Sequence, residues 1–409
     1  MRPRSLFERC YQLEGKVDAK AEALARELAA APPPYYDGLH MTLLEGVKPV
    51  TRIRTPSGEV REMLMFGSNS FLNLNFHPRV IAAERKAAEK YGSGAGSPPL
   101  YAGTTDLHTE LEETLARFCG TEAALIFPAG YSGNLGVLSG LLRPGDTVFC
   151  DSMNHASLFD GIRLSGAKLV PYPHLNMKYL RRVIAPRAMI VSDGVFSMEG
   201  SLAPVDELVR IKQENDGFLM IDDAHGFWAV GEEGVGTAGL FGVRDAVDLH
   251  YGTFSKALGS VGGFAAGSKA VIDYLRYYAR STFFSSALPA TTVAAVLESI
   301  RIVREEPEHL RNLKRNRDLF QSELERRGFD TLGSRSAILP VLVGDEEKLG
   351  RFQMMLFAEG LFSNIGTTPA VAASKCRLRL NVMATHTPEQ LTHAAELLER
   401  CARVCGVLP

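Results

Sequence analysis

Two separate segments carry residue types that together point to one chemistry. Lys256 lies among small and hydroxyl-bearing residues in the run Gly252–Gly259, and Asp222 ends the apolar run Phe218–Asp222. A lysine in such surroundings can be desolvated and can form a Schiff base. A carboxylate at the end of a buried strand can hold a ring nitrogen protonated. A Ser-Lys pair alone is more often a solvated surface charge, but the two segments together indicate pyridoxal phosphate, with Lys256 as the Schiff-base lysine.

Two histidines are placed to serve the same ring. His225 follows Asp222 closely, and an imidazole there can hydrogen-bond the phenolic oxygen of the cofactor. His155 follows the strand pattern that ends at Asp151, where an imidazole can stack on a planar ring. For an isolated histidine, a buried structural role or a capping role is the more common alternative.

The phosphate of such a cofactor needs backbone amides and hydroxyls. Gly130 and Tyr131 open a helix pattern directly after a strand pattern, so their amides and the helix dipole would form an anion site. Thr253 adds a hydroxyl near Lys256, and Ser285 and Ser286 are further candidates. A turn of small residues is equally common without a ligand, and the two serines also fit a turn before a proline.

A substrate carboxylate would need an arginine, whose planar fork suits bidentate binding. Arg377 and Arg379 lie in a strand pattern and share one face, although such pairs are usually just solvated. The GxGxxG match at Gly234–Gly239 lacks a preceding strand and a following amphipathic helix, so we reject it as a dinucleotide site. The cysteines form no CxxC pair and no zinc-ligand spacing, and no metal is expected.

The bulk properties fit an ordinary globular enzyme. The chain has 409 residues, 45% hydrophobic and 22% charged, with a formal net charge of -2. This balance gives no electrostatic footprint for nucleic acid or an anionic membrane surface. The basic start Met1–Arg4 is not followed by an apolar segment, so neither a signal peptide nor a membrane span is expected. The six cysteines read as reduced thiols, and we expect a cytoplasmic protein.

The order of apolar patterns predicts an α/β fold. Short apolar runs alternate with helical patterns such as 156–165 and 205–215, which favours a mostly parallel sheet with helices on both faces. A cofactor site is then expected at the carboxyl ends of the strands. The strand candidates are 124–127, 147–151, 168–172, 188–193, 218–222, 247–253 and 263–267.

The two ends of the chain differ from this middle part. Residues 7–30 have helical composition and end before Pro32–Pro34, and Thr55–Glu59 is turn chemistry between two short strand candidates. A charged helix over 291–327, strands near 337–343 and 376–383, and a helix over 388–405 predict a smaller α+β module. We therefore expect an accessory segment (1–60), a large cofactor-binding domain (61–290) and a small C-terminal domain (291–409).

The ordered motifs of the chain resemble those of the α-oxoamine synthases, pyridoxal phosphate-dependent acyltransferases of aminotransferase-like fold type I. The resemblance runs from about Met65 to the C-terminus, and within the family several runs lean towards bacterial serine palmitoyltransferases. It rests on Gly67–Leu72, Gly103–Glu112, Asn154–Ser157, Asp193–Gly200, Asp222–His225, Gly252–Lys256 and Arg377–Arg379.

The resemblance implies a role for each of these positions. Lys256 would carry the internal aldimine and move protons, Asp222 would pair with the pyridinium nitrogen, and His225 and Ser197 would lie at the phenolic oxygen. His155 would stack on the ring, and Asn69 and Arg379 would bind substrate, Arg379 more so than Arg377. The remaining positions serve the phosphate, across a homodimer in the case of the two serines: Gly130, Tyr131, Thr253, Ser285 and Ser286.

The implied reaction is a decarboxylative Claisen condensation of an amino acid with an acyl thioester. L-serine with a long-chain acyl thioester, as in sphingolipid biosynthesis, is the first expectation. The alternatives are glycine or alanine, as in aminoketobutyrate ligase or 8-amino-7-oxononanoate synthase, and a natural-product synthase. Pro98 stands where family members commonly have arginine, so the donor, coenzyme A or acyl carrier protein, stays open. Asn73, where glycine is usual, is a second departure.

Overall fold

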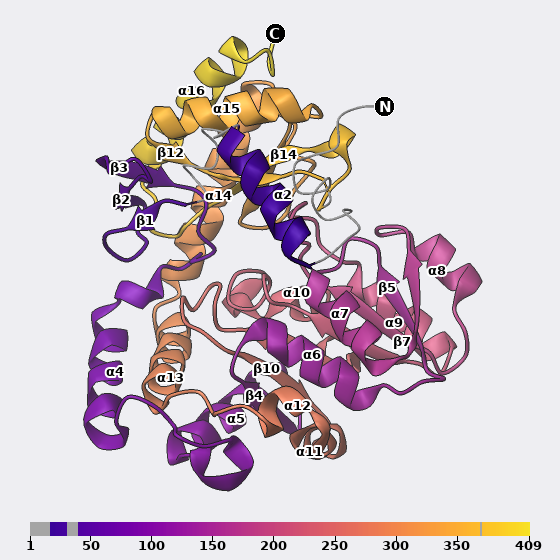
Figure 1. Ribbon diagram of the computed structural model, residues 1–409. Helices are drawn as coiled ribbons and strands as arrows, with labels where there is room; N and C mark the ends of the chain where they lie inside the picture. The colour runs from indigo at the N-terminus through magenta and orange to yellow at the C-terminus, as the bar shows by residue number, and fades with distance from the viewer. Residues whose placement is uncertain (1–16, 31–39, 369) are drawn as a thin grey trace. The chain divides into compact units, whose positions relative to one another are not determined.

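The computed structural model describes residues 17–30, 40–368 and 370–409. They fall into two compact units, each described by itself below (Figure 1). The larger unit is the continuous stretch Asn69–Leu313, and the smaller unit combines the residues up to Ser68 with Lys314–Pro409. These divisions lie at 68 and 313, whereas the sequence places domain boundaries at 60 and 290.

A seven-stranded sheet forms the centre of the larger unit. Its order is β4-β10-β9-β8-β7-β5-β6; β10 is antiparallel to both of its neighbours, and all other pairings are parallel. All seven predicted strands are confirmed, with ends shifted by two residues or fewer. The strands are β4 (Ala123–Phe127), β5 (Thr147–Asp151), β6 (Lys168–Tyr172), β7 (Met189–Asp193), β8 (Phe218–Asp222), β9 (Leu249–Thr253) and β10 (Gly263–Gly267).

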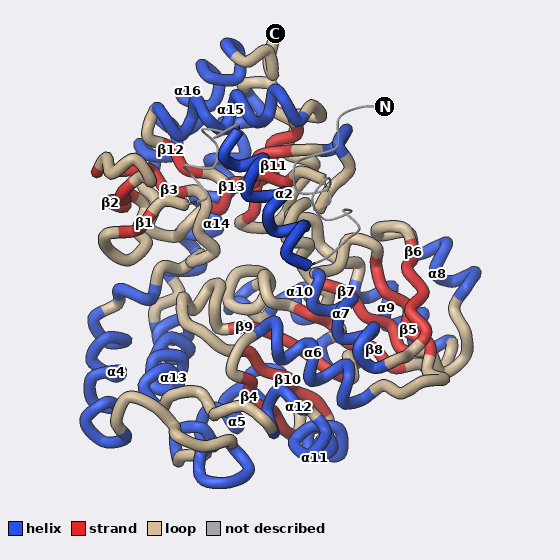
Figure 2. The backbone as a smooth tube through the Cα atoms, viewed as in Figure 1, coloured by secondary structure: helices blue, strands red, loops and turns tan. Residues whose placement is uncertain are grey.

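Helices cover both faces of this sheet, as predicted (Figure 2). The side chains of a strand alternate between faces, so Val148 and Cys150 of β5 join one core while Phe149 joins the other. The first core is closed by α6 (Gly130–Leu141), α7 (Ala156–Ser165) and α11 (Lys269–Tyr278). The second is closed by α8 (Met177–Val183) and α9 (Val205–Glu214).

The long helix predicted over 291–327 is two helices, which corrects that prediction. α13 (Ala290–Glu305) ends before Pro307, and α14 (Glu308–Arg326) begins after it. Proline lacks an amide donor and disfavours helical backbone at the residue before it, and Glu306 accordingly has φ -120° and ψ 69°. The break presents Glu306 and the first turn of α14 beside the start of α4 (Pro78–Tyr91).

Further helices complete the larger unit. α4 lies alongside α13 in Figures 1 and 2. The remaining elements are η1 (Leu74–Phe76), α4 (Pro78–Tyr91), the π-helical turn η2 (Pro99–Gly103), α5 (Asp106–Cys119), η3 (Glu232–Gly234), α10 (Gly236–Leu240), η4 (Arg244–Ala246) and α12 (Arg280–Phe283).

The smaller unit contains two small sheets. One has the order β1-β2-β3-β12, and the other, β11-β14-β13, is antiparallel throughout. The predicted turn Thr55–Glu59 is confirmed, because the amide of Thr55 donates to the carbonyl of Glu59 at 2.9 Å between β2 and β3. The strands are β1 (Thr42–Leu43), β2 (Val50–Arg54), β3 (Val60–Met65), β11 (Ile338–Leu342), β12 (Leu361–Phe362), β13 (Asn364–Gly366) and β14 (Arg377–Asn381).

Helices α15 (Glu346–Ala358) and α16 (Pro388–Val404) pack on this unit's core, with η5 (Ala373–Lys375) before β14. The predicted N-terminal helix is present as α2 (Val17–Ala30); its predicted first part and Pro32–Pro34 lie outside the described residues. Within the described ranges, no helix has both the length and the apolar character that a membrane span requires.

Candidate active site

Several predicted site residues lie at or just after the carboxyl ends of three adjacent strands, β7, β8 and β9. In register, Asp193 at the end of β7 lies beside Asp222 at the end of β8, and Asp222 lies beside Tyr251 in β9. β9 ends at Thr253, three residues before Lys256. Parallel strands of an open α/β sheet commonly place a site at this edge.

Asp222 is a buried carboxylate that accepts hydrogen bonds from two neutral amides. The amide of Asn134 donates to its Oδ2 at 2.7 Å, and the backbone amide of Ala224 donates to its Oδ1 at 3.1 Å. Burial raises the pKa of Asp222, while the hydrogen bond from Asn134 and the charges of His155 and Lys256 oppose that rise. A cationic ring nitrogen at this carboxylate would supply the ion-pair partner that burial demands.

A chain of hydrogen bonds links Asp222 to the predicted stacking histidine. The Nδ2 of Asn134, which donates to Asp222, also donates to the hydroxyl of Ser157 at 2.9 Å. That hydroxyl lies 2.7 Å from Nδ1 of His155, and the Ser157 amide donates to the same nitrogen at 3.3 Å. Nδ1 of His155 therefore acts as an acceptor, which leaves Nε2 as the nitrogen that can donate. The side-chain amide of Asn134 thus orients Asp222 directly, and His155 through Ser157.

Asp193 holds the backbone of the same histidine. Its Oδ2 accepts the amide hydrogen of His155 at 3.1 Å, and the side chain of Asn154 bridges the amide of Asp193 and the carbonyl of Val191. Burial and the charge of Asp222 raise the pKa of Asp193 well above its ordinary value. Asp222 receives two hydrogen bonds at its carboxylate and Asp193 one, which opposes the effect of burial more strongly at Asp222.

The turn after β8 is shaped by Asp223, the neighbour of Asp222. Its Oδ2 accepts from both the amide and the hydroxyl of Thr237, at 2.6 and 3.0 Å. A Cβ on Gly194 or Gly226 would lie about 2 Å from Oδ1, so these positions must be glycine. The rejected GxGxxG segment therefore serves as a partner of this carboxylate, because its residue Thr237 fixes the turn that leads to His225.

Two of the predicted phosphate-binding positions, Gly130 and Thr253, lie close together. α6 begins at Gly130, and the first amides of a helix have no partner within the helix. A Cβ on Gly130 would lie 2.9 Å from Oγ1 of Thr253, so the helix start and the end of β9 are in close approach. The hydroxyl of Tyr251 donates to the carbonyl of Gly130 and fixes this start. The hydroxyl of Thr253 donates to the carbonyl of Gly262 at 2.7 Å, which orders the loop before β10.

The other predicted residues lie around these strand ends. Lys256 and Ser197 are half-buried, whereas His225 is buried with its ring 5.9 Å from that of Phe71. Tyr131 is exposed, donates to the carboxylate of Asp160, and meets the ring of His155 edge-on at 6.2 Å.

Three further positions lie on loops of the larger unit. Ser285 is half-buried and Ser286 exposed, both between α12 and α13, and Asn69 is half-buried before η1. The departure at Asn73 has a backbone cause: its φ is 55°, in the left-handed region that glycine adopts freely and asparagine tolerates best among other residues.

The arginine pair lies on β14 of the smaller unit. Arg377 and Arg379 are 2% and 6% exposed, so the half-exposed, solvated strand considered from the sequence is wrong. The Nε of Arg377 donates to the carbonyl of Lys375 at 2.7 Å. A charge buried to this degree needs specific partners, and the role of Arg379 towards a substrate stays a prediction.

Comparison with known proteins identifies the family. Residues 61–398 match the model of the class I and II aminotransferases. The 8-amino-7-oxononanoate synthase 1 of Bacillus subtilis is 41% identical over 371 residues, which covers 89% of this chain and 95% of the relative. The serine palmitoyltransferase of Sphingobacterium spiritivorum is 42% identical over 345 residues, covering 83% and 86%.

This chain belongs to the pyridoxal phosphate-dependent α-oxoamine synthases. Its fold agrees: a solved serine palmitoyltransferase with the pyridoxal phosphate internal aldimine superposes with a TM-score of 0.90 at 29% identity, over 96% of this chain and all of that one. The cofactor of this synthase is pyridoxal phosphate, and its residues fit that group. Within the part of the chain that the structure describes, the hydrogen-bond donors to the buried carboxylate of Asp222 are two neutral amides, and the start of α6 approaches Thr253 so closely that only glycine fits at Gly130.

Asn134, Ser157 and Asp193 are functional candidates that sequence reasoning missed. Asn134 follows the helix start that the sequence marks at Gly130 and Tyr131, and Ser157 and Asp193 stand only within the family motifs. One signal was available: Asp193 and Asp222 both end apolar strand patterns. Their adjacency depends on strand order, which no local pattern reveals, and the amide of Asn134 reaches both partners only after α6 and α7 pack together.

Proposed function

We propose that this synthase condenses L-alanine with an acyl thioester whose chain ends in a carboxylate, and releases carbon dioxide and the free thiol. The observation that carries the amino-acid chemistry is the buried network from Asp222 through Asn134 and Ser157 to His155. The choice of alanine is supported by relatives: further bacterial proteins at 40–44% identity also bear the name 8-amino-7-oxononanoate synthase.

The name of that product fixes the two substrates by atom balance. Alanine that loses its carboxyl group keeps a methyl group and an amine-bearing carbon, which become the last two carbons of an 8-amino-7-oxononanoate. The carbonyl and the remaining chain, with its terminal carboxylate, must come from the acyl donor. One carbon–carbon bond forms, and one carbon–carbon bond and one thioester bond break.

When bound, pyridoxal phosphate supplies an electron sink for the carbon that loses its proton. Asp222, held ionised by Asn134, keeps the ring nitrogen protonated in this proposal. Lys256 binds the cofactor, takes the α-proton of the amino acid and later returns one to the product. His155 stacks on the ring, with its orientation fixed by Ser157.

The remaining residues bind and orient. Arg379 takes the amino acid carboxylate, with Asn69 on the substrate side. His225 and Ser197 hold the phenolic oxygen of the cofactor. Gly130, Tyr131 and Thr253 hold the phosphate, joined by Ser285 or Ser286 from the second subunit of a homodimer. We place this dimer in the cytoplasm, with coenzyme A or an acyl carrier protein bearing the acyl group.

L-serine with a long-chain acyl thioester is the second candidate. The 42% identity to the S. spiritivorum serine palmitoyltransferase and the TM-score of 0.90 favour it. Both candidates use the same residues up to the attack on the thioester. They differ in the side chain of the amino acid and in whether the far end of the acyl chain is charged.

Spectral titration separates the two candidates. The holoenzyme is titrated with L-alanine, L-serine and glycine, and each acyl donor is then offered with a free-thiol assay. L-alanine should give a saturable change in the visible band, and thiol release should be faster with a terminal carboxylate on the acyl chain. Saturation by L-serine alone, with a preference for an uncharged long chain, would replace the first candidate by the second.

A further inference from the structure

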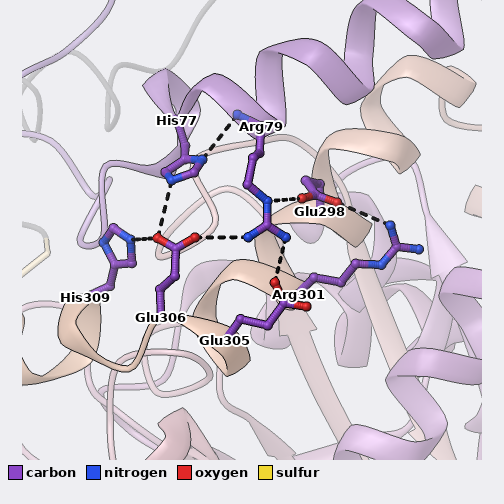
Figure 3. Close-up of polar contacts among 7 residues, drawn as sticks. All are labelled: His77, Arg79, Glu298, Arg301, Glu305, Glu306 and His309. Atoms are coloured by element: carbon purple, nitrogen blue, oxygen red, sulfur yellow. Dashed lines mark hydrogen bonds and ion pairs between the residues drawn. The ribbon is translucent and has the colours of Figure 1, made fainter.

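Two histidines and a glutamate meet at the start of α4, away from the strand ends that carry the reaction. His77 precedes α4, Glu306 lies in the break between α13 and α14, and His309 lies in the first turn of α14. All three belong to the larger unit. Figure 3 shows both imidazole rings turned towards the carboxylate of Glu306.

Both rings point at the same carboxylate oxygen. The Nε2 of His77 lies 3.5 Å and the Nε2 of His309 lies 3.3 Å from Oε2 of Glu306. One ligand atom from each residue lies within 4.8 Å of the other two. Around a tetrahedral zinc ion with bonds of about 2.0–2.2 Å, ligand atoms lie about 3.3–3.5 Å apart. Two of the separations already have this length, and rotation of the rings can close the third.

The surrounding charges favour a cation. Arg79 binds the other oxygen of Glu306, Oε1, at 3.0 Å, and also pairs with Glu298 at 2.6 Å and Glu305 at 2.7 Å. Arg301 pairs with the second oxygen of Glu298 at 3.2 Å. Glu298, Glu305 and Glu306 thus face the guanidinium groups of Arg79 and Arg301, so with neutral imidazoles these paired groups carry a net negative charge.

The cluster is shielded but reachable. The side chains of His77, Glu306 and His309 are 20%, 28% and 20% exposed. Arg79 holds Oε1 of Glu306, which leaves Oε2 directed at both imidazoles.

We propose that His77, Glu306 and His309 form a binding site for a divalent first-row metal ion, Zn²⁺ by preference, with water as the fourth ligand. Two imidazoles and one carboxylate are a donor set that zinc accepts. The ion would tie the start of α4 to the connection between α13 and α14. Its ligands come from distant segments and match no spacing pattern, so the sequence alone does not predict this site.

Binding would compete with one weak contact. The Nδ1 of His77 accepts the amide hydrogen of Arg79 at 3.3 Å, which caps α4. A metal on Nε2 requires the proton of the neutral imidazole on Nδ1, so the cap is lost when the ion binds. Without metal, Nε2 of His309 lies within hydrogen-bonding distance of Glu306, and Glu306 pairs with Arg79.

Metal titration of the chelator-treated holoenzyme tests the site. Zn²⁺ is followed by calorimetry, and Co²⁺ by its ligand-field absorption, in the wild type and in His309→Ala. The matched control is His393→Ala, which removes an exposed histidine of α16. We expect one ion per chain in the wild type and the control, a rise in melting temperature on binding, and affinity weakened at least about tenfold in His309→Ala.

The outcome does not depend on one variant. If His309→Ala fails to fold, Glu306→Gln removes a ligand charge while keeping the shape of the side chain, and it should weaken binding in the same way. The proposal is overturned if the wild type shows no saturable Co²⁺ spectrum, or if Zn²⁺ binds both ligand variants as well as it binds the wild type. Ions held by the cofactor phosphate would bind the wild type and all variants equally, and that outcome would also overturn the proposal.

Discussion

Replacing Asn134 by alanine tests the buried network most sharply. Its Nδ2 makes two hydrogen bonds, one to the Asp222 carboxylate at 2.7 Å and one to the Ser157 hydroxyl at 2.9 Å. The variant leaves Asp222 with one backbone donor, the amide of Ala224. A hydrogen bond to a charged group contributes about 1.5–3 kcal/mol. If this energy holds Asp222 ionised for the reaction, kcat should fall about ten- to hundredfold.

A shift in pH dependence distinguishes this effect from a general structural one. Asn134 lowers the pKa of Asp222, so the variant should have a higher pKa at that carboxyl. Asp222 would then be protonated, and activity lost, at pH values where the wild type still works. The acid limb of the kcat profile should therefore move to higher pH, and a pH series of steady-state rates measures this directly.

Ser139→Ala is the matched control, because its hydroxyl lies on the same helix and bonds only to the carbonyl of Leu135. It should leave both kcat and its pH profile unchanged. The reasoning is refuted if Asn134→Ala behaves like Ser139→Ala, or if its kcat falls without any movement of the acid limb.

Three further predictions concern Ser157, Asp223 and the arginine pair of β14. Ser157→Ala removes one of two donors to Nδ1 of His155, so kcat should fall about two- to tenfold. An unchanged rate would show that the Ser157 hydroxyl does not orient His155 for the reaction. Burial raises the pKa of Asp223 to about 7, so the folded protein holds a proton that the unfolded chain releases above its ordinary pKa. Asp223 therefore contributes a fall in stability of at most about 1.4 kcal/mol per pH unit as pH rises towards 7, and Asp223→Asn should make the slope shallower by that contribution in urea unfolding of the apoprotein; an equal slope in both proteins would contradict the raised pKa. Arg379→Lys should raise KM for the amino acid about tenfold or more with less effect on kcat, whereas Arg377→Lys should not; the reverse order would exchange the two assignments.

The sheet was predictable because parallel strands covered on both faces need continuous apolar runs. β5, β6, β8 and β10 begin and end where the sequence pattern does, and the other strands differ by two residues or fewer. Pro307 lies inside the helix expected over 291–327, and the charged helical pattern continues on both sides of it. Proline prevailed because it removes a backbone donor and constrains the residue before it.

The positions of the candidate catalytic residues follow the sheet, because each lies at a strand end or just after it. Lys256, Asp222, His225 and His155 are all of this kind. What holds them was not predictable, because Asn134 reaches its partners only after helix packing. The burial of Arg377 likewise depends on the strands and helices that cover β14, which an alternating charged pattern does not reveal.

The most direct test of the central claim follows the atoms of one turnover. L-alanine labelled in its carboxyl carbon is mixed with the holoenzyme and the carboxylate-terminated acyl thioester, and labelled carbon dioxide and free thiol are measured together. We expect equal amounts of both, dependent on both substrates, and neither from Lys256→Ala. Thiol release without carbon dioxide, or equal release from the lysine variant, would contradict decarboxylative condensation at this site.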